Sequence, residues 1–344
     1  MLKSVFAVWR PDRPLRSAST ARACRKSRKS SCWAADAIAQ SVVGRFAPSP
    51  TGRLHAGSLL AAVGSYVSAR QQGGRWLLRI EDLDPPRAEA GASAAILNSL
   101  EAHGLRWDGP VTYQLPRAEH YEAALQKLIK SNLLYPCRCS RQQLLDYAST
   151  HHRLSSCSIC TGTCRVDGVT LASTDVAWRL RTAAAGRITF TDILRGEQHS
   201  QLHEQVGDIV LKRRDGLYAY QLAVVVDDAA TGVTEVVRGA DLLDNTARQC
   251  WLMQCLGLSR PRYLHLPVIT GHNGQKLSKQ NHAPALNNLT AAENVWLALQ
   301  ALGQSPQAAL KNAEPAEILA WACENWRVKR IPHPDSIGQN CYLA

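Results

Sequence analysis

Two short segments, about 220 residues apart in the sequence, carry residue types that could act on a phosphate. The first runs from Arg45 to Ser58 and reads RFAPSPTGRLHAGS, and the second is Lys276-Leu-Ser-Lys279-Gln280. In the first, His55, Gly57 and Ser58 lie where a loop turns into a helix, whose N-terminus offers unpaired N–H groups and a partial positive charge to an anion. In the second, two lysines add positive charge on a short loop.

Brought together, the two segments would hold the phosphates of a nucleotide from two sides. A glycine at position 57 lets a ligand approach the backbone, and His55, Lys276 and Lys279 would neutralise charge as it builds up in the transition state. This equipment suits attack of a carboxylate on the α-phosphate of ATP with release of pyrophosphate, which requires no nucleophilic side chain. Either segment alone is a weak signal, because HxGS occurs by chance and Lys-Leu-Ser-Lys is often a solvated loop.

The elements around the first segment predict a parallel sheet. Residues 42–46 are expected to form a strand, a helix follows from about His55, and Trp76–Ile80 is a second buried strand. Strand, helix and strand make a βαβ unit, which implies a parallel sheet in an α/β fold. Further helices are expected at about 89–103, 117–131 and 290–326, strands at Tyr220–Asp228, Val233–Val237 and Tyr263–Ile269, and a loose tail after Arg330.

Length and charge suit a globular chain with two domains or subdomains. The first forty residues hold nine Lys or Arg and two Asp, so +7 of the formal +12 lies there and the rest is mildly basic. Contact with nucleic acid is thus permitted rather than demanded. These first forty residues have the composition of an organelle transit peptide, but we favour a disordered basic arm or an upstream start assigned in error. No apolar run suits a membrane span or secretory signal, so we expect a cytoplasmic protein without a membrane partner.

Five of the eleven cysteines fall between Cys137 and Cys164. Cys137 and Cys139 form one close pair and Cys160 and Cys164 another, and four thiolates suit tetrahedral Zn²⁺. Such a site would stabilise a polar stretch that has few long apolar runs. Rival ligands are Cys157, His151 and His152.

Several segments together resemble the class I glutamyl-tRNA synthetases. Arg45–Ser58 is similar to their HIGH-motif segment and Lys276–Gln280 to their KMSKS loop. The other matching segments are Arg79–Arg87, Tyr220–Asp228, Val236–Leu243 and the continuation of the lysine loop to Leu286. The resemblance covers about residues 42–330 and fails for 1–41.

The resemblance implies a Rossmann-type catalytic domain with an inserted zinc-bearing subdomain. The expected parts are a basic extension (1–41), the first half of the catalytic domain (42–131), the insertion (132–200), the second half with the KMSKS-like loop (201–285), a helical part (286–330) and a tail (331–344). The family's zinc ligands would correspond to Cys137, Cys139, Cys160 and Cys164.

The resemblance also implies where the amino acid would bind. The family's glutamate-contacting positions correspond to Arg45, Ala47, Ser49, Glu81, Tyr220 and Arg238, and its ATP-binding positions to His55, Gly57, Ser58 and Lys279. Arginines suit carboxylates, and Glu81 could pair with the ammonium group. Taken singly, Arg45, Glu81 and Arg238 would more simply be ordinary ion pairs.

The expected reaction is therefore activation of L-glutamate by ATP, with Mg²⁺, to glutamyl-adenylate. Only 64 residues follow Gln280, too few for the anticodon-binding region of full-length relatives. The resemblance is thus to a truncated branch that transfers glutamate to the queuosine base at the wobble position of tRNA(Asp), and we expect a monomer. The rival hypotheses are a truncated synthetase that charges a tRNA 3′ end and a non-catalytic paralogue that binds tRNA.

Overall fold

The computed structural model describes residues 41–150, 164, 169–271, 276–277, 284–333 and 335–338. All of them belong to a unit that spans Ser41–Ala344. The predictions made for residues 1–40, for Lys279 and for Cys160 and its rivals Cys157, His151 and His152 lie outside the described residues.

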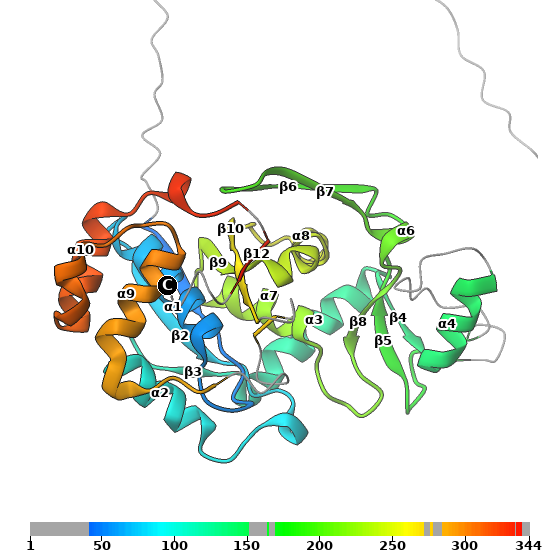
Figure 1. Cartoon of the computed structure of the whole chain (residues 1–344). Helices are drawn as coiled ribbons and strands as arrows, with labels where there is room; N and C mark the ends of the chain where they lie inside the picture. The colour runs from blue at the N-terminus through cyan, green and yellow to red at the C-terminus, as the bar shows by residue number, and fades with distance from the viewer. Residues whose placement is uncertain are drawn as a thin grey trace, which may run out of the picture. The chain divides into compact units, whose positions relative to one another are not determined.

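The centre of this unit is a parallel sheet (Figure 1). β1 (Val43–Phe46) pairs with β2 (Arg75–Ile80), which pairs with β3 (Thr112–Tyr113), and α1 (Ala56–Arg70) connects β1 to β2. The predicted βαβ unit is confirmed. A second parallel set consists of β9 (Glu235–Gly239), β10 (Arg262–Leu266) and β6 (Arg187–Asp192), and β7 (Gly196–Gln201) runs antiparallel to β6.

The two sets of strands meet where β1 lies beside the start of β9. The Thr234 N–H group donates to the Val43 carbonyl at 2.9 Å, and the Val43 N–H group donates to the Thr234 hydroxyl at 2.9 Å. In the order of the strands, β2 lies next to β1 on one side of this junction, and β10 lies next to β9 on the other side. The crevice outside the carboxyl ends of two such strands is where open α/β sheets bind ligands.

Helices cover both faces of the sheet because successive strand residues point to opposite sides. In β9, Val237 packs with α1, α2 (Ala92–Ala102), α9 (Ala291–Ala301) and α10 (Pro315–Asn325). Its neighbour Val236 packs with α3 (Ala118–Lys130), α7 (Tyr220–Ala230) and α8 (Leu243–Leu256). The helices expected near 89–103 and 117–131 are confirmed, and the stretch 290–326 holds α9 and α10 with a short 3-10 helix at Ala308–Asn312 between them.

The segment Tyr220–Asp228, which we expected to be a strand, is the helix α7. Most of it is buried, including Leu222, Val224 and Val225, since α7 packs against α3 and α8. Burial on nearly all sides removes the polar face that reveals helical periodicity, and the valines favour a strand by propensity. The prediction was wrong because tertiary packing overrode that local preference.

The segments around this sheet form two smaller sheets. β4 (Leu134–Cys137), β5 (Ala177–Leu180) and β8 (Ile209–Lys212) are antiparallel, and α4 (Arg141–Thr150) follows β4. The short helix α6 (Leu202–Gln205) comes directly before β8 in the chain. The second sheet pairs β11 (Val268–Thr270) with β12 (Ser336–Gly338) in parallel. We expected a loose tail after Arg330, and for these three residues that prediction was wrong.

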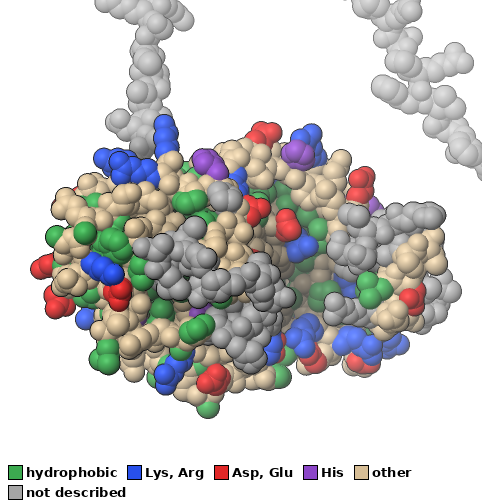
Figure 2. Space-filling view, in the orientation of Figure 1, with side chains coloured by type: hydrophobic (Ala, Val, Ile, Leu, Met, Phe, Trp, Pro, Cys, Tyr) green, Lys and Arg blue, Asp and Glu red, His purple; other side chains and the backbone are tan. Residues whose placement is uncertain are grey.

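The expected strand Tyr263–Ile269 is divided into β10 and β11 at Pro267, which has no N–H group to donate. None of the helices in the described ranges is long and apolar enough to cross a membrane. Figure 2 shows basic side chains in several small groups interspersed with acidic ones on this face of the molecule.

Candidate functional site

A cleft of about 520 Å³ lies at the carboxyl ends of β1 and β9, where the direction of strand progression reverses. It is lined by all ten of the described residues that we predicted for catalysis or for substrate binding. They are Arg45, Ala47, Ser49, His55, Gly57, Ser58, Glu81, Tyr220, Arg238 and Lys276. The structure therefore brings together segments that are about 220 residues apart in the sequence.

His55 is the N-cap of α1, with extended backbone angles (φ −124°, ψ 173°) directly before the first helical turn. Its Nδ1 atom accepts a hydrogen bond from the Ser58 N–H group at 3.4 Å. A Cβ atom at Gly57 would lie 3.1 Å from the His55 ring and 3.6 Å from the Leu277 carbonyl oxygen. The glycine thus keeps the helix N-terminus open between the histidine and the lysine loop, and this is the arrangement that an anionic group needs.

Lys276, from the second segment, lines the same cleft as this helix N-terminus. The neighbouring Leu277 N–H group donates to the Ile269 carbonyl of β11 at 2.8 Å, which fixes the start of the loop beside the cleft. The Lys276 Nζ atom lies 2.5 Å from Oδ2 of Asp241, another residue that lines the cleft. Asp241 thus holds the ammonium group at the wall of the cleft.

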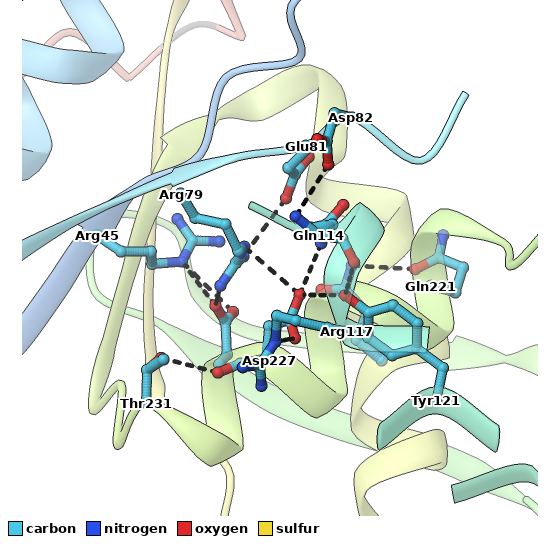
Figure 3. Close-up of polar contacts among 12 residues, drawn as sticks. Arg45, Arg79, Glu81, Asp82, Gln114, Arg117, Tyr121, Gln221, Asp227 and Thr231 are labelled. Atoms are coloured by element: carbon cyan, nitrogen blue, oxygen red, sulfur yellow. Dashed lines mark hydrogen bonds and ion pairs between the residues drawn. The ribbon is translucent and has the colours of Figure 1, made fainter. Parts of the chain in front are cut away.

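Arg45 and Arg79 converge on one carboxylate (Figure 3). The hydrogen bonds identify it as that of Asp228 in α7. The distances to Asp228 Oδ1 are 3.3 Å from Arg45 Nε and 2.7 Å from Arg79 Nη1, and all three side chains are buried. Burial alone would raise the pKa of Asp228, but the charges of Arg45 and Arg79 lower it below its ordinary value. Asp228 therefore stays ionised and fixes both guanidinium groups.

Glu81 follows β2 at the edge of the cleft, and its Oε1 atom lies 3.4 Å from Arg79 Nη2. Burial raises the pKa of Glu81 above its ordinary value, although Arg79 and Arg45 oppose this change. A cation placed beside Glu81 would therefore stabilise its charged form. Burial, followed by the charge of Glu81, also raises the pKa of Tyr220, which keeps its hydroxyl group protonated and able to donate.

Arg238, in β9, offers an unsatisfied nitrogen atom. Its Nε–H group donates to His265 Nε2 at 3.1 Å, and its Nη2 atom donates to the Thr246 hydroxyl at 2.8 Å and to the Leu242 carbonyl at 3.3 Å. Within the described part of the chain, its Nη1 atom is buried with no hydrogen-bond partner. Buried polar groups are nearly always hydrogen-bonded, so this nitrogen is suited to a ligand that supplies an acceptor, and a carboxylate fits best.

Sequence reasoning missed several residues that support the site. Asp227, beside Asp228, accepts hydrogen bonds from Gln114, Arg117 and Tyr121 at 2.8, 2.6 and 2.8 Å (Figure 3). The two adjacent acids at the end of an apolar run were the available signal, because acids are seldom buried without partners. Asp192 and His265 left no comparable signal in the sequence.

Three of the four predicted zinc ligands lie together. The Sγ atom of Cys164 is 3.4 Å from that of Cys139 and 3.8 Å from that of Cys137, and all three ligand atoms lie within 4.8 Å of one another. With Zn–S bonds of about 2.3 Å, a tetrahedral site separates its thiolates by about 3.8 Å. The three residues thus fit a zinc ion, and the fourth predicted ligand, Cys160, lies outside the described residues.

The chain is similar over most of its length to proteins named glutamyl-Q tRNA(Asp) synthetase. It is 49% identical to the one from Pseudomonas fluorescens over 299 residues, covering 87% of this chain and 96% of that protein. It is 51% identical to the one from Dechloromonas aromatica over 294 residues, covering 86% and 97%.

Two further comparisons address the fold and the family. A glutamate tRNA ligase from Elizabethkingia meningosepticum, solved in complex with its amino acid, superimposes with a TM-score of 0.70 and 22% identity, covering 87% of this chain and 67% of that one. This likeness shows the fold. The family model of the class I tRNA synthetases (E and Q), catalytic domain, matches residues 41–296. The chain is therefore a ligase-type enzyme that belongs to the class I tRNA synthetases (E and Q), among the proteins named glutamyl-Q tRNA(Asp) synthetase.

Proposed function

We propose that this enzyme activates L-glutamate with ATP to glutamyl-adenylate and transfers the glutamate to the queuosine base at the wobble position of tRNA(Asp). One observation carries the proposal: a single cleft combines buried arginines suited to carboxylates with an open helix N-terminus suited to phosphate. The names of the relatives supply the tRNA and its modified base.

Glutamate carries two carboxylates and one ammonium group, and the cleft offers a complementary charge to each of them. Arg238, through Nη1, and Arg45 are the donors for the carboxylates. Glu81 is the partner for the ammonium group, because its own charge is only partly compensated in the absence of a ligand. The Tyr220 hydroxyl, the Ser49 side chain and the Ala47 backbone add hydrogen bonds at the wall of the cleft.

In the activation step, a carboxylate oxygen of glutamate attacks the α-phosphorus of ATP. The new O–P bond forms as the bond to the bridging oxygen breaks, and pyrophosphate leaves with the electron pair. His55 and the N–H groups at the start of α1 contact the phosphates, and Lys276 and Lys279 neutralise the charge that develops on the leaving group. Mg²⁺ would enter with ATP and screen its phosphates.

In the transfer step, a nucleophilic group of the modified base attacks the carbonyl carbon of the adenylate. The bond to AMP breaks, AMP leaves with the electron pair, and the nucleophile loses its proton to solvent. The base must be presented from a single-stranded anticodon loop, in which bases can be turned out and bound by their edges. We also expect the enzyme to act in the cytoplasm and as a monomer.

We also propose that Cys137, Cys139 and Cys164, with Cys160, hold a structural Zn²⁺ ion in a small inserted subdomain. The spacing of the three sulfur atoms supports this assignment. Bound zinc would supply folding energy to the segment between β4 and β5 and takes no part in the reaction.

Transfer of radiolabelled glutamate to purified tRNA(Asp), with and without queuosine, tests the proposal, with nuclease mapping of the label. Label in the anticodon fragment, only when queuosine is present, is the expected result. Label on the 3′-terminal adenosine, or charging of tRNA(Glu) instead, would identify a shortened synthetase. Absence of glutamate-dependent pyrophosphate exchange would identify a non-catalytic tRNA-binding protein.

A second test concerns the glutamate assignment. We expect Arg238→Ala to raise the KM for glutamate in pyrophosphate exchange far more than the KM for ATP, because the proposal assigns this donor to the amino acid and not to the nucleotide. Equal changes in the two KM values would contradict the assignment.

A further inference from the structure

We propose that Asp192 and His265 are positioning residues that hold Arg238 in an orientation that leaves its Nη1 atom to pair with the substrate carboxylate. This inference rests on the proposed function, since it assigns Arg238 to glutamate. It concerns residues that lie behind the cleft wall rather than on it.

The three side chains come from three neighbouring strands. Asp192 ends β6, His265 lies in β10, and Arg238 lies in β9 directly opposite His265 in the strand register. Asp192 and His265 are 1% and 0% exposed, and Arg238 is 5% exposed. Because β10 lies between the other two strands, His265 is the only member of the set that can touch both of the others.

The hydrogen bonds determine which ring nitrogen of His265 carries the proton. Asp192 Oδ2 accepts from the His265 backbone N–H group at 2.9 Å and lies 2.8 Å from its Nδ1 atom. The second oxygen of Asp192, Oδ1, accepts from the backbone N–H groups of Leu194 and Arg195 at 3.0 and 2.9 Å. A carboxylate engaged in this way can only accept, so the Nδ1 atom of His265 is the donor.

His265 is therefore neutral and presents a lone pair at Nε2. Burial lowers the pKa of His265, and the nearby charge of Arg238 acts in the same direction, although Asp192 opposes both. The lone pair accepts from Arg238 Nε–H at 3.1 Å, and the Thr246 hydroxyl lies at the same distance. A protonated ring, or the other tautomer, would place an N–H group against the Arg238 Nε–H group.

The arrangement fixes the guanidinium group at two of its three nitrogens. Nε is held by His265, and Nη2 is held by Thr246 and the Leu242 carbonyl. Nη1 is the nitrogen left over, and Arg238 lines the cleft. Because a planar guanidinium group held at two nitrogens cannot rotate, the third keeps one direction, and this pre-organisation lowers the cost of binding a carboxylate.

Two substitutions at His265 separate the role of its two nitrogens. His265→Asn places an amide where Nδ1 was and can still donate to Asp192, but it leaves Arg238 Nε without an acceptor. His265→Gln extends an amide oxygen to the place of Nε2 and can still accept from Arg238. His103→Gln is the matched control, because His103 is also fully buried and bonds to Ser99 and Asn294 instead.

Glutamate-dependent pyrophosphate exchange is the assay, with KM measured separately for glutamate and ATP and with the Tm of each variant. We expect His265→Asn to raise the glutamate KM by at least about tenfold, as for a lost hydrogen bond to a charged group, with the ATP KM unchanged. We expect His265→Gln to restore most of the glutamate affinity at a similar Tm. His103→Gln should lower the Tm without separating the two KM values.

Three outcomes would count against the inference. If both His265 variants keep the wild-type glutamate KM, the positioning role is overturned. The same conclusion holds if both raise the two KM values in parallel with a fall in Tm, because a merely structural role predicts that pattern. If the wild-type enzyme itself shows no glutamate-dependent exchange, the proposed function fails first and the inference with it.

Discussion

Replacing Asp228 with asparagine should destabilise the enzyme strongly, because this carboxylate holds two buried arginines. Asp228 is 4% exposed and pairs with Arg45 and Arg79. Breaking a buried ion pair by removing one partner typically costs about 3–5 kcal/mol of unfolding free energy, since the remaining charge stays buried.

The contacts of each arginine narrow this range. Arg79 would still lie 3.4 Å from Glu81 and 3.9 Å from Asp227, whereas Arg45 would lose the carboxylate with which it pairs. The asparagine oxygen can still accept one hydrogen bond. We therefore expect a loss near the lower limit, about 3 kcal/mol, and a fall in Tm of roughly 4–5 °C for a chain of this size.

Urea unfolding of the wild type and Asp228→Asn at pH 7 is the assay. Asp175→Asn is the control, because its ion pair with Arg214 is solvent-exposed and its loss should cause no measurable change. The folded-state pKa of Asp228 is lowered, so its stabilisation is present above the unfolded-state pKa and disappears as the pH falls through the folded-state value. A difference below about 1 kcal/mol at pH 7, or one that does not shrink in acid, would refute the reasoning.

Three further predictions concern the lysine loop, the helix N-terminus and the cysteines. Lys276→Ala should lower the kcat of pyrophosphate exchange by about 10²–10³-fold with little change in the glutamate KM; an unchanged kcat would remove Lys276 from the phosphate site. Gly57→Ala should reduce kcat at nearly unchanged Tm, because the added Cβ would lie 3.1 Å from the His55 ring; full activity would show that the helix N-terminus is not approached by phosphate. Cys139→Ala should lose zinc by elemental analysis while Cys255→Ala keeps it, and equal metal content in both would exclude the cysteine site.

The residues that sequence reasoning found are those that line the cleft. His55, Gly57 and Lys276 stand in short segments whose residue types follow from the chemistry of a phosphate, so the segments could be identified without knowing the fold. They converge because the carboxyl ends of parallel strands lie at one edge of the sheet, where ligands bind in open α/β folds. The first βαβ unit was enough to predict where that edge would be.

The supporting residues could not be predicted in the same way, since their role depends on the pairing of distant strands and helices. Asp192 and His265 meet because β6 and β10 are neighbours in the sheet, although 73 residues separate them in the sequence. Asp228 reaches Arg45 because α7 is a helix, and the strand that we expected there would have aimed its side chains to alternate faces. The error about this element thus hid the partner of Arg45, a residue that lines the cleft.

The two arginines of the cleft are held by different kinds of partner, and under the proposed function this difference bears on which of them would bind the substrate more strongly. Arg45 contacts Asp228 directly, so much of its charge is already compensated. Arg238 is separated from Asp192 by a neutral histidine, and among the described residues it forms no ion pair of its own within 4.0 Å. A direct carboxylate would orient Arg238 equally well but would also neutralise it. Because His265 transmits the orientation without the negative charge, we expect Arg238 to keep more of its attraction for an incoming carboxylate than Arg45 does, and a neutral amide in place of that carboxylate to lose more at Arg238 than at Arg45.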